Sequence, residues 1–242
     1  MMGKQNCIKL FLKKLFIGKT NFENTPIHST FKRRLNNIKS IWNSESDDDI
    51  GLERKIRLML ATSQLFFLGT YIKEIFHKKG IVYQEIFIDL FVLIKLFLPV
   101  VTITYGLQSN IIIYNVLIWF LLETLLYIPT LIFASDIFSK PRSYRRSILL
   151  LFLNYLEIIF TFSVIYSRGN HLHGANYWYD YIYFSFVTAS TTGYGDIYPI
   201  TMIGKFLVCL QIIIFVLFVV IFFNFFSTKI GSKGYFDDKN KN

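Results

Sequence analysis

The chain has few of the residues that build most enzyme and disulfide-rich sites. Among 242 residues there are only 2 cysteines and 4 histidines. Cys7 and Cys209 lie far apart and show no metal-ligand spacing, so neither a disulfide framework nor a cysteine metal site is expected. We find no nucleophile elbow and no phosphate-binding loop. The chain is therefore not expected to be an enzyme and needs no cofactor. It also lacks an internal repeat.

Hydrophobic residues are abundant and the charge is strongly basic. They make up 53% of the chain, aromatic residues alone make up 18%, and the formal net charge is +10. In so hydrophobic a chain, basic residues fit cytoplasmic loops and anionic membrane lipids better than nucleic acid, which is not an expected partner. The composition predicts an all-α integral membrane protein.

Four hydrophobic stretches are long enough to cross a bilayer, which takes about 20 residues. We expect these transmembrane helices at residues 81–105, 111–134, 148–166 and 206–227. A fifth stretch, residues 58–72, is shorter and more polar. It is either an interfacial helix or a fifth span.

A short polar segment lies between the last two predicted spans. Its sequence, Thr188-Ala189-Ser190-Thr191-Thr192-Gly193-Tyr194-Gly195-Asp196, resembles the selectivity filter of potassium channels, T-x-x-T-x-G-Y-G-D. An aromatic segment too short to span the bilayer precedes it, and a long uncharged helix follows. Helix, filter and helix together resemble the potassium channel pore domain, a family of tetrameric pore-loop cation channels.

The resemblance implies how K⁺ is bound. Four copies of the strand would supply rings of oxygens that replace the ion's water shell. The filter residues are Thr191, Thr192, Gly193, Tyr194 and Gly195, and K⁺ is expected at the carbonyls of the first four. Glycines at 193 and 195 allow backbone angles that other residues resist. Because one filter occurs per chain, a homotetramer is expected.

The same resemblance assigns residues that support the filter. A re-entrant pore helix is expected from about Tyr181 to Ala189, with Asp180 near its positive end. The expected supporting residues are Tyr183, Phe184, Thr188 and Asp196. His171 and His173 lie in the preceding outer loop, where solvent-exposed histidines without a role are favoured over a pH sensor.

Basic residues predict the orientation and the domains. Residues 135–147 and the N-terminal tail are rich in Lys and Arg, which places both termini in the cytoplasm of a multi-pass cell-membrane protein. The expected divisions are a basic tail (1–55), an interfacial helix or short extra span (56–80), a two-helix hairpin with its linker (81–146), the pore domain (147–228) and a short C-terminal tail (229–242). Residues 8–16 are expected to form a helix that lies on anionic lipid or packs against the channel's own helices.

Two features bear on gating. A voltage sensor needs several arginines at every third position, and only Arg142 and Arg145 have that spacing, so strong voltage gating is not expected. Nor is gating by a C-terminal ligand-binding domain. The usual hinge glycine is replaced by Phe215, and Phe223 and Asn224 fall near the cytoplasmic narrowing as the candidate gate.

One set of ionisable residues lies within the predicted spans. These residues are costly there unless they pair or face water. We expect pairing between helices, with a proton or ion pathway as the alternative, for Glu85, Asp89, Lys95, Glu123 and Glu157. The predicted function is passive, K⁺-selective conduction. The alternatives are a weakly selective monovalent cation channel, or a non-conducting scaffold or transporter subunit.

Overall fold

The fold was analysed in a computed structural model of the full chain. The structure describes residues 30–43, 51–76, 80–133 and 144–230. The predictions for the N-terminal lipid-binding helix, for most of the basic linker at 135–147 and for the C-terminal tail therefore lie outside the described residues.

The described chain is almost entirely helical, as the composition predicts. Its four long helices are α5 (Ile81–Thr104), α6 (Ile111–Phe133), α7 (Tyr144–Arg168) and α9 (Met202–Ile230). Three of them, α5, α7 and α9, are long and apolar enough to cross a membrane, and α6 contributes a shorter apolar stretch at Ile111–Tyr127. Each helix covers one of the four predicted spans, and α7 and α9 extend beyond the predicted bounds. The chain is an all-α membrane protein.

A tight connection joins α5 to α6. Gly106 adopts a left-handed conformation (φ 68°) after the end of α5, and the short 3₁₀ helix η3 (Leu107–Ser109) follows. The side chain of Asn110 then accepts a hydrogen bond of 2.9 Å from the backbone N–H of Ile112. This bond satisfies one of the N–H groups that a helix start leaves unpaired.

The described residues up to Phe91 form one compact unit, which includes the first residues of α5. It contains α2 (Thr30–Trp42), α3 (Leu52–Ser63), the 3₁₀ helix η1 (Gln64–Phe66) and α4 (Leu68–Phe76). The buried Arg34 of α2 donates from Nη1 to the backbone oxygen of Gln64, at 3.1 Å. Phe67 is extended (ψ 125°), so the stretch 58–72 is not one continuous helix. Neither α3 nor α4, with 12 and 9 residues, has the length of a span.

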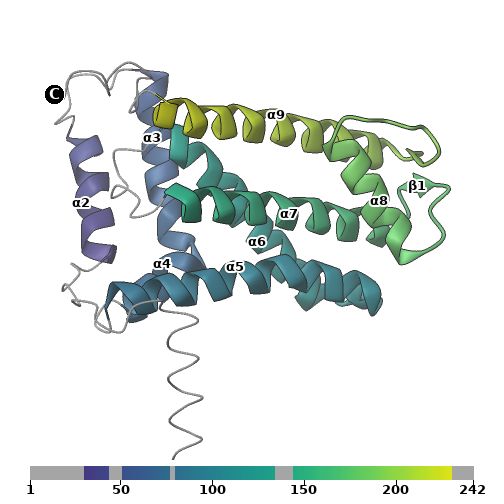
Figure 1. Ribbon diagram of the computed structural model, residues 1–242, viewed down its shortest axis with the longest axis horizontal. Coiled ribbons are helices and arrows are strands. Elements are labelled where there is room, and N and C mark those ends of the chain that lie inside the picture. The colour runs from purple at the N-terminus through teal and green to yellow at the C-terminus, as the bar shows by residue number, and fades with distance from the viewer. Residues whose placement is uncertain (1–29, 44–50, 77–79, 134–143, 231–242) are drawn as a thin grey trace, which may run out of the picture. The chain divides into compact units, whose positions relative to one another are not determined.

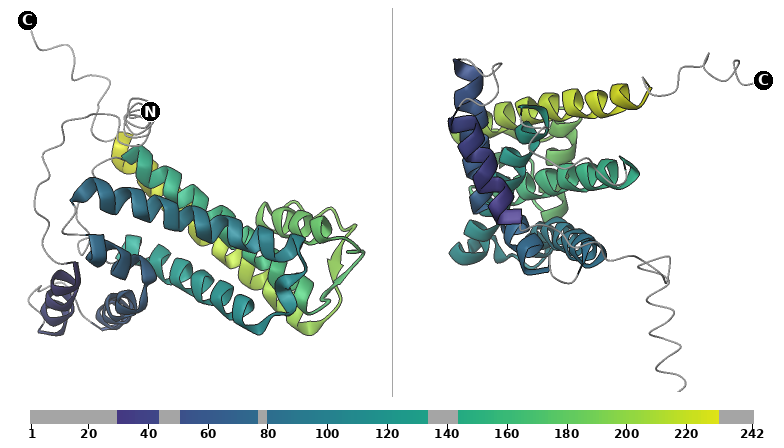
Figure 2. Two further views of the ribbon diagram at one scale, coloured as in Figure 1. Left: turned by 90° about the horizontal axis from the view of Figure 1, so that it is seen from below. Right: turned by 90° about the vertical axis from the view of Figure 1, so that its left-hand side faces the viewer.

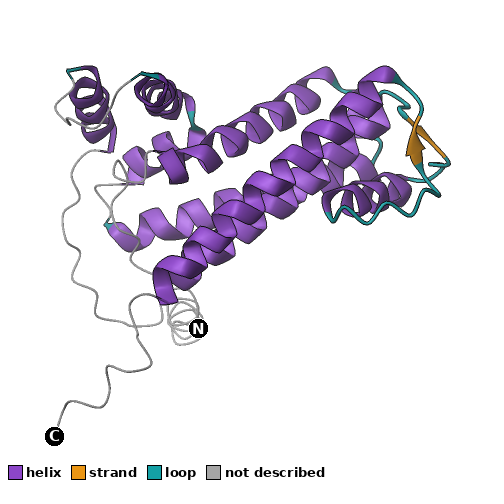
Figure 3. Cartoon of the chain, turned by 90° about the horizontal axis from the view of Figure 1, so that it is seen from above, coloured by secondary structure: helices purple, strands orange, loops and turns teal. Residues whose placement is uncertain are grey.

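The second unit, from Val92 onward, contains the rest of α5 and all the later elements. Helices α7 and α9 run beside each other, and the shorter α8 (Trp178–Ala189) lies at one end (Figures 1 and 2). Two strands of two residues each, β1 (Leu172–His173) and β2 (Tyr198–Pro199), pair antiparallel at that same end (Figure 3). The sequence did not predict these strands.

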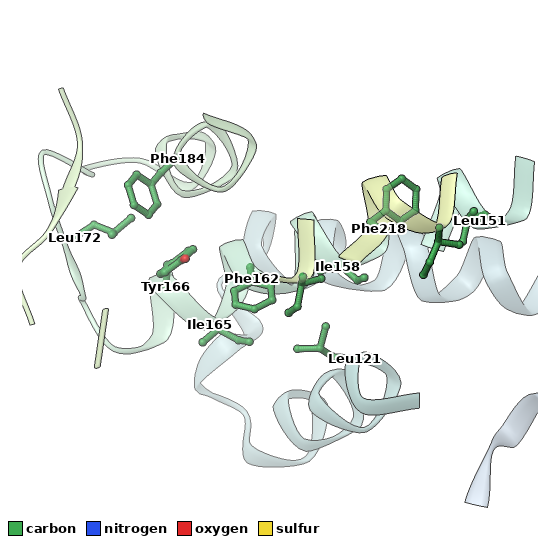
Figure 4. Close-up of a cluster of buried hydrophobic side chains, with 11 residues drawn as sticks. Leu121, Leu151, Ile158, Phe162, Ile165, Tyr166, Leu172, Phe184 and Phe218 are labelled. Atoms are coloured by element: carbon green, nitrogen blue, oxygen red, sulfur yellow. The ribbon is translucent and has the colours of Figure 1, made fainter. Parts of the chain in front are cut away.

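A hydrophobic cluster joins α7, α8 and α9. Tyr166 lies among Phe184, Leu172 and Phe162, which come from α8, β1 and α7 (Figure 4). Toward the N-terminus of α7, Leu151 and Ile158 belong to the same cluster, together with Phe218 of α9 and Leu121 of α6. This cluster attaches α8 to the two long helices, and the polar segment 190–197 follows α8 directly.

Candidate functional site

The start of α8 is fixed by an acidic residue in its first turn. Asp180 accepts hydrogen bonds of 2.8 Å from the backbone N–H groups of Asn176 and Tyr177. A carboxylate here also complements the positive end of the helix dipole. The helix therefore begins at Trp178, three residues before the predicted start near Tyr181. The sequence prediction was wrong on this boundary because Asp180 lies inside the first turn rather than ahead of it.

After α8, the backbone angle φ is positive at every second residue from 191 to 195. Thr191, Gly193 and Gly195 have φ values of 55°, 62° and 82°, whereas the intervening Thr192 and Tyr194 are not among the described residues with positive φ. The two glycines have the permissive angles that were expected from the sequence. Thr191 was not expected to join them. A β-branched residue with positive φ is strained by about 1–3 kcal/mol, and such strain clusters at functional sites.

Hydrogen bonds tie this segment to the last turn of α8. The N–H of Thr191 donates to the carbonyl of Thr188, and the N–H of Thr192 donates to that of Val187, each at 3.0 Å. The hydroxyls of Ser190 and Thr192 are 2.8 Å apart. Thr188 itself is buried. The position of α8 therefore determines where residues 191 and 192 begin.

Only one of the two predicted aromatic residues touches this segment within the chain. The ring of Tyr183 stacks against that of Tyr194, with centroids 6.5 Å apart and planes 6° apart. Its hydroxyl donates to Oδ2 of Asp196 at 2.8 Å. Phe184 points away, into the hydrophobic cluster, where it meets the ring of Tyr166 edge-on at 5.0 Å. Tyr183 thus contacts residues 194 and 196, and Phe184 anchors α8.

The loop before α8 is held to the segment after it. His171 Nδ1 lies 2.7 Å from the hydroxyl of Thr201, and its carbonyl accepts a bond of 2.9 Å from the N–H of Ile200. The ring of His173 stacks on that of Tyr198. The expectation of solvent-exposed histidines without a role was wrong for His171, which is half-buried and joins the two strands to α9.

A comparison with family models finds a likeness in this region. Residues 148–231 match a model described as an ion channel, so this part of the chain is similar to that family. The match covers most of α7, all of α8, the polar segment and α9, which is the helix–filter–helix order recognised in the sequence. A channel pore is not an enzyme, as the sequence analysis expects. No curated protein and no solved structure matched the chain.

The predicted gate of the channel lies in α9. Phe223 is 69% exposed in the single chain. Its neighbour Phe222 is half-buried, and its ring stacks on Phe218 with centroids 6.3 Å apart. Asn224 belongs to α9, but its side chain lies outside the described ones. The two phenylalanines therefore differ in surroundings as the helical spacing predicts.

A buried hydrogen-bond network that the sequence analysis missed joins the three helices of the channel's pore region. Tyr166 of α7 donates to Oε1 of Gln211 in α9 at 2.9 Å. Gln211 Nε2 in turn donates to the carbonyl and the hydroxyl of Ser185 in α8, at 3.0 and 2.9 Å. The signal in the sequence was a single amide, Gln211, within the uncharged run 206–223.

A second buried network joins the preceding hairpin to α7. Lys95 Nζ of α5 lies 3.7 Å from Oε2 of Glu157 in α7. Thr124 of α6 donates to the same oxygen at 2.7 Å and accepts a hydrogen bond from Lys95. The expected pairing of intramembrane charges between helices is confirmed for Lys95 and Glu157. Thr124 was not predicted.

Proposed function

We propose that the chain conducts K⁺ passively through a homotetrameric pore lined by the filter residues Thr191, Thr192, Gly193, Tyr194 and Gly195. The observation that carries the proposal is the alternating sign of φ along this segment. Carbonyls that all face one axis require permissive angles at regular positions, and here they recur at every second residue. At Thr191 this alternation requires a positive φ, which is a strained conformation for threonine.

The surroundings of the filter support an assembly of several chains. Residues 190–196 are exposed in the single chain, Tyr194 by 70%, although the helices around them are well packed. On α9, the apolar side chains of Phe206, Ile213 and Val220 are also exposed, each by more than half. Four copies around an axis would cover the filter and part of α9. A single filter per chain makes four the required number.

Charge supports the orientation of the channel. In this proposal the filter end of α7 and α9 faces outward, and the basic residues 135–147, with both termini, face the cytoplasm. Within this division, residues 81–146 are a hairpin beside the pore domain 147–228. Tags fused to either terminus are expected to be labelled only by membrane-impermeant reagents applied from the cytoplasmic side. Labelling of an N-terminal tag from outside the cell would refute the orientation.

Anionic lipid is the proposed partner of the N-terminal part. On α2, Phe31, Leu35 and Trp42 are exposed at spacings of one and two helical turns, which places them on one face. Lys32 and Lys39 are exposed along one edge of that face. Apolar and basic side chains together fit the headgroup region of an anionic leaflet. The double change Lys32→Gln/Lys39→Gln is expected to weaken any dependence of flux on phosphatidylserine in the vesicles.

Flux through purified channel in liposomes tests the conduction proposal. Wild-type protein is expected to carry K⁺ down a gradient, with a reversal potential close to that of K⁺ when Na⁺ is the opposing ion. Alanines at Gly193, Tyr194 and Gly195 are expected to abolish the flux and leave the tetramer intact. Mixed tetramers with one mutant subunit are expected to be silent as well, since one faulty strand breaks each carbonyl ring.

The alternatives give different results in the same experiment. A reversal potential midway between those of Na⁺ and K⁺ would establish a weakly selective cation channel. An assembled wild-type tetramer that carries no ion under any gradient would establish a non-conducting scaffold and refute the proposal. Undiminished flux in the triple-alanine variant would show that the filter is not at these residues.

A further inference from the structure

Gln211 occupies a position in which every polar group of its side chain is used. Its Oε1 accepts from the Tyr166 hydroxyl, and its Nε2 donates to both the carbonyl and the hydroxyl of Ser185. Turning the amide over would set its oxygen against the carbonyl of Ser185, so only one orientation satisfies all partners. The network specifies a unique side-chain geometry.

The network is closed to water and continues into α7. Tyr166 and Ser185 are 0% exposed, and Gln211 is 2% exposed. The hydroxyl of Ser185, which accepts from Gln211, donates onward to the carbonyl of Ile159 at 2.6 Å. Since no water can replace a lost partner here, displacing Gln211 leaves several polar groups buried and unpaired.

Ser185 lies in the second half of α8, the helix that leads into the proposed filter. It is one helical turn before Ala189, the last residue of α8. Between them are Val187 and Thr188, whose carbonyls accept the N–H groups of Thr192 and Thr191. A shift of α8 therefore shifts the two carbonyls that position the first filter residues.

Gln211 is carried by the helix that also carries the candidate gate. Phe223 follows it by 12 residues, which is about 18 Å along an α-helix. Apolar contacts between α9 and its neighbours tolerate small rotations, but the three hydrogen bonds of Gln211 do not. We propose that Gln211 is a positioning residue through which the inner helix α9 sets the place of the pore helix α8, and with it the filter.

The effect on conduction rests on the proposed function, whereas the effect on α8 does not. The first measurement is therefore backbone hydrogen exchange of residues 185–192 in the purified, folded protein. Gln211→Leu has a similar volume and removes all three bonds. It is expected to speed exchange in this segment at least about five-fold, the factor that corresponds to one lost hydrogen bond of about 1 kcal/mol. Unchanged exchange in a folded Gln211→Leu protein would overturn the proposal.

Non-additivity separates the network from general loss of stability. Tyr166→Phe removes one bond, and in a Gln211→Leu background it has none left to remove. The double variant is therefore expected to exchange no faster than Gln211→Leu alone. Tyr155→Phe is the matched control, because it removes the 3.1 Å hydrogen bond from the Tyr155 hydroxyl to the carbonyl of Ala189 but keeps the ring that stacks on Phe218 of α9. Its effect is expected to add to that of Gln211→Leu.

Single-channel recording then tests the consequence for conduction. Relative to conducting wild-type channels, Gln211→Leu is expected to shorten conducting bursts about five-fold, whereas Leu149→Ile, a change at an exposed position near the start of α7, leaves them unchanged. If the conducting bursts of Gln211→Leu last as long as those of the wild type, the link between Gln211 and the filter is wrong. A silent wild-type channel would instead refute the proposed function and leave the exchange result to decide the positioning of α8. If Gln211→Leu does not assemble, Ser185→Ala and Tyr166→Phe replace it, and unchanged exchange in both overturns the proposal.

Discussion

The buried pair of Lys95 and Glu157 provides the most quantitative prediction. The two side chains are 4% and 0% exposed, and their charged atoms are 3.7 Å apart. At an effective dielectric constant of about 20, that separation corresponds to an attraction of roughly 4.5 kcal/mol. Lys95 Nζ also lies 5.8 Å from the centre of the Phe120 ring. The pair is thus enclosed by three helices, α5, α6 and α7.

Removing one charge alone is expected to be much worse than removing both. Lys95→Met leaves the Glu157 carboxylate buried, with the Thr124 hydroxyl donating to Oε2 and no hydrogen bond to Oε1 in the described structure. The expected cost is about 3–5 kcal/mol. In the double variant Lys95→Met/Glu157→Leu no buried charge remains at either position, and most of that loss is expected to be recovered.

Thermal unfolding of the purified protein in nanodiscs measures these differences. With about 2–4 °C per kcal/mol for a chain of this size, Lys95→Met is expected to lower Tm by roughly 6–20 °C. Lys205→Met, the same change at an exposed position on α9, is the control and is expected to leave Tm unchanged. A Lys95→Met protein that melts with the wild type, or a double variant that melts no higher than Lys95→Met, would refute the pairing.

Three further predictions concern the pore. Phe223→Ala is expected to raise basal K⁺ leak because it opens a hydrophobic constriction, whereas Phe222→Ala, which loses core packing, should mainly lower Tm; equal leak in both variants would argue against a gate at Phe223. Open probability is expected to change little with voltage, since the chain has no arginine ladder, and a measured gating charge of several elementary charges would contradict this. Gly174→Ala is expected to disrupt the filter exit and reduce current, because its new Cβ would lie 2.9 Å from the carbonyl of Asp196. Gly106→Ala, with a similar positive φ and open space around it, should cost only backbone strain of about 1–2 kcal/mol and leave the current unchanged.

Hydrophobic length was enough to predict the long helices. Runs of apolar residues in a membrane protein must satisfy their backbone internally, so each became a helix within a few residues of the expected bounds, apart from the extensions of α7 and α9. The stretch 58–72 was ambiguous because its composition suits both alternatives. An extended residue, Phe67, divides this stretch into two helical parts. Phenylalanine does not indicate a helix break, so the division was not predicted. The two-residue strands were too short to leave a periodic signal.

The positive φ angles at Gly193 and Gly195 were predictable because the requirement for glycine is local. Glycine is the residue that adopts positive φ most easily, so its presence at 193 and 195 indicates this backbone conformation from the sequence alone. The strained Thr191 was not predictable, since nothing in a threonine indicates positive φ. The start of α8 was misplaced for a related reason: Asp180 is compatible with a position before the first turn or within it, and only the bonds to residues 176 and 177 decide.

The specific partners in the two buried networks could not be assigned from the sequence, because they depend on how each helix is rotated. Helix α9 is apolar on nearly every side, so its sequence does not indicate which face meets α7 and α8. The partners of Gln211 are 26 and 45 residues away in the chain. Lys95 and Glu157 were recognised as costly within a membrane, which predicts pairing, but several acidic residues were available to Lys95.

Helix α7 takes part in both networks, and this gives it a specific role in the fold. On one side its Glu157 meets Lys95 and Thr124 of the hairpin; on the other its Tyr166 meets Gln211 of α9. In a bilayer, apolar side chains gain little by leaving lipid for one another, so apolar packing alone leaves helix rotation weakly determined. Buried polar contacts with a single satisfactory geometry remove that freedom. The rotation of α7 is therefore fixed at two points nine residues apart, about 13.5 Å along its axis, and the pore helix and the hairpin are both aligned against it.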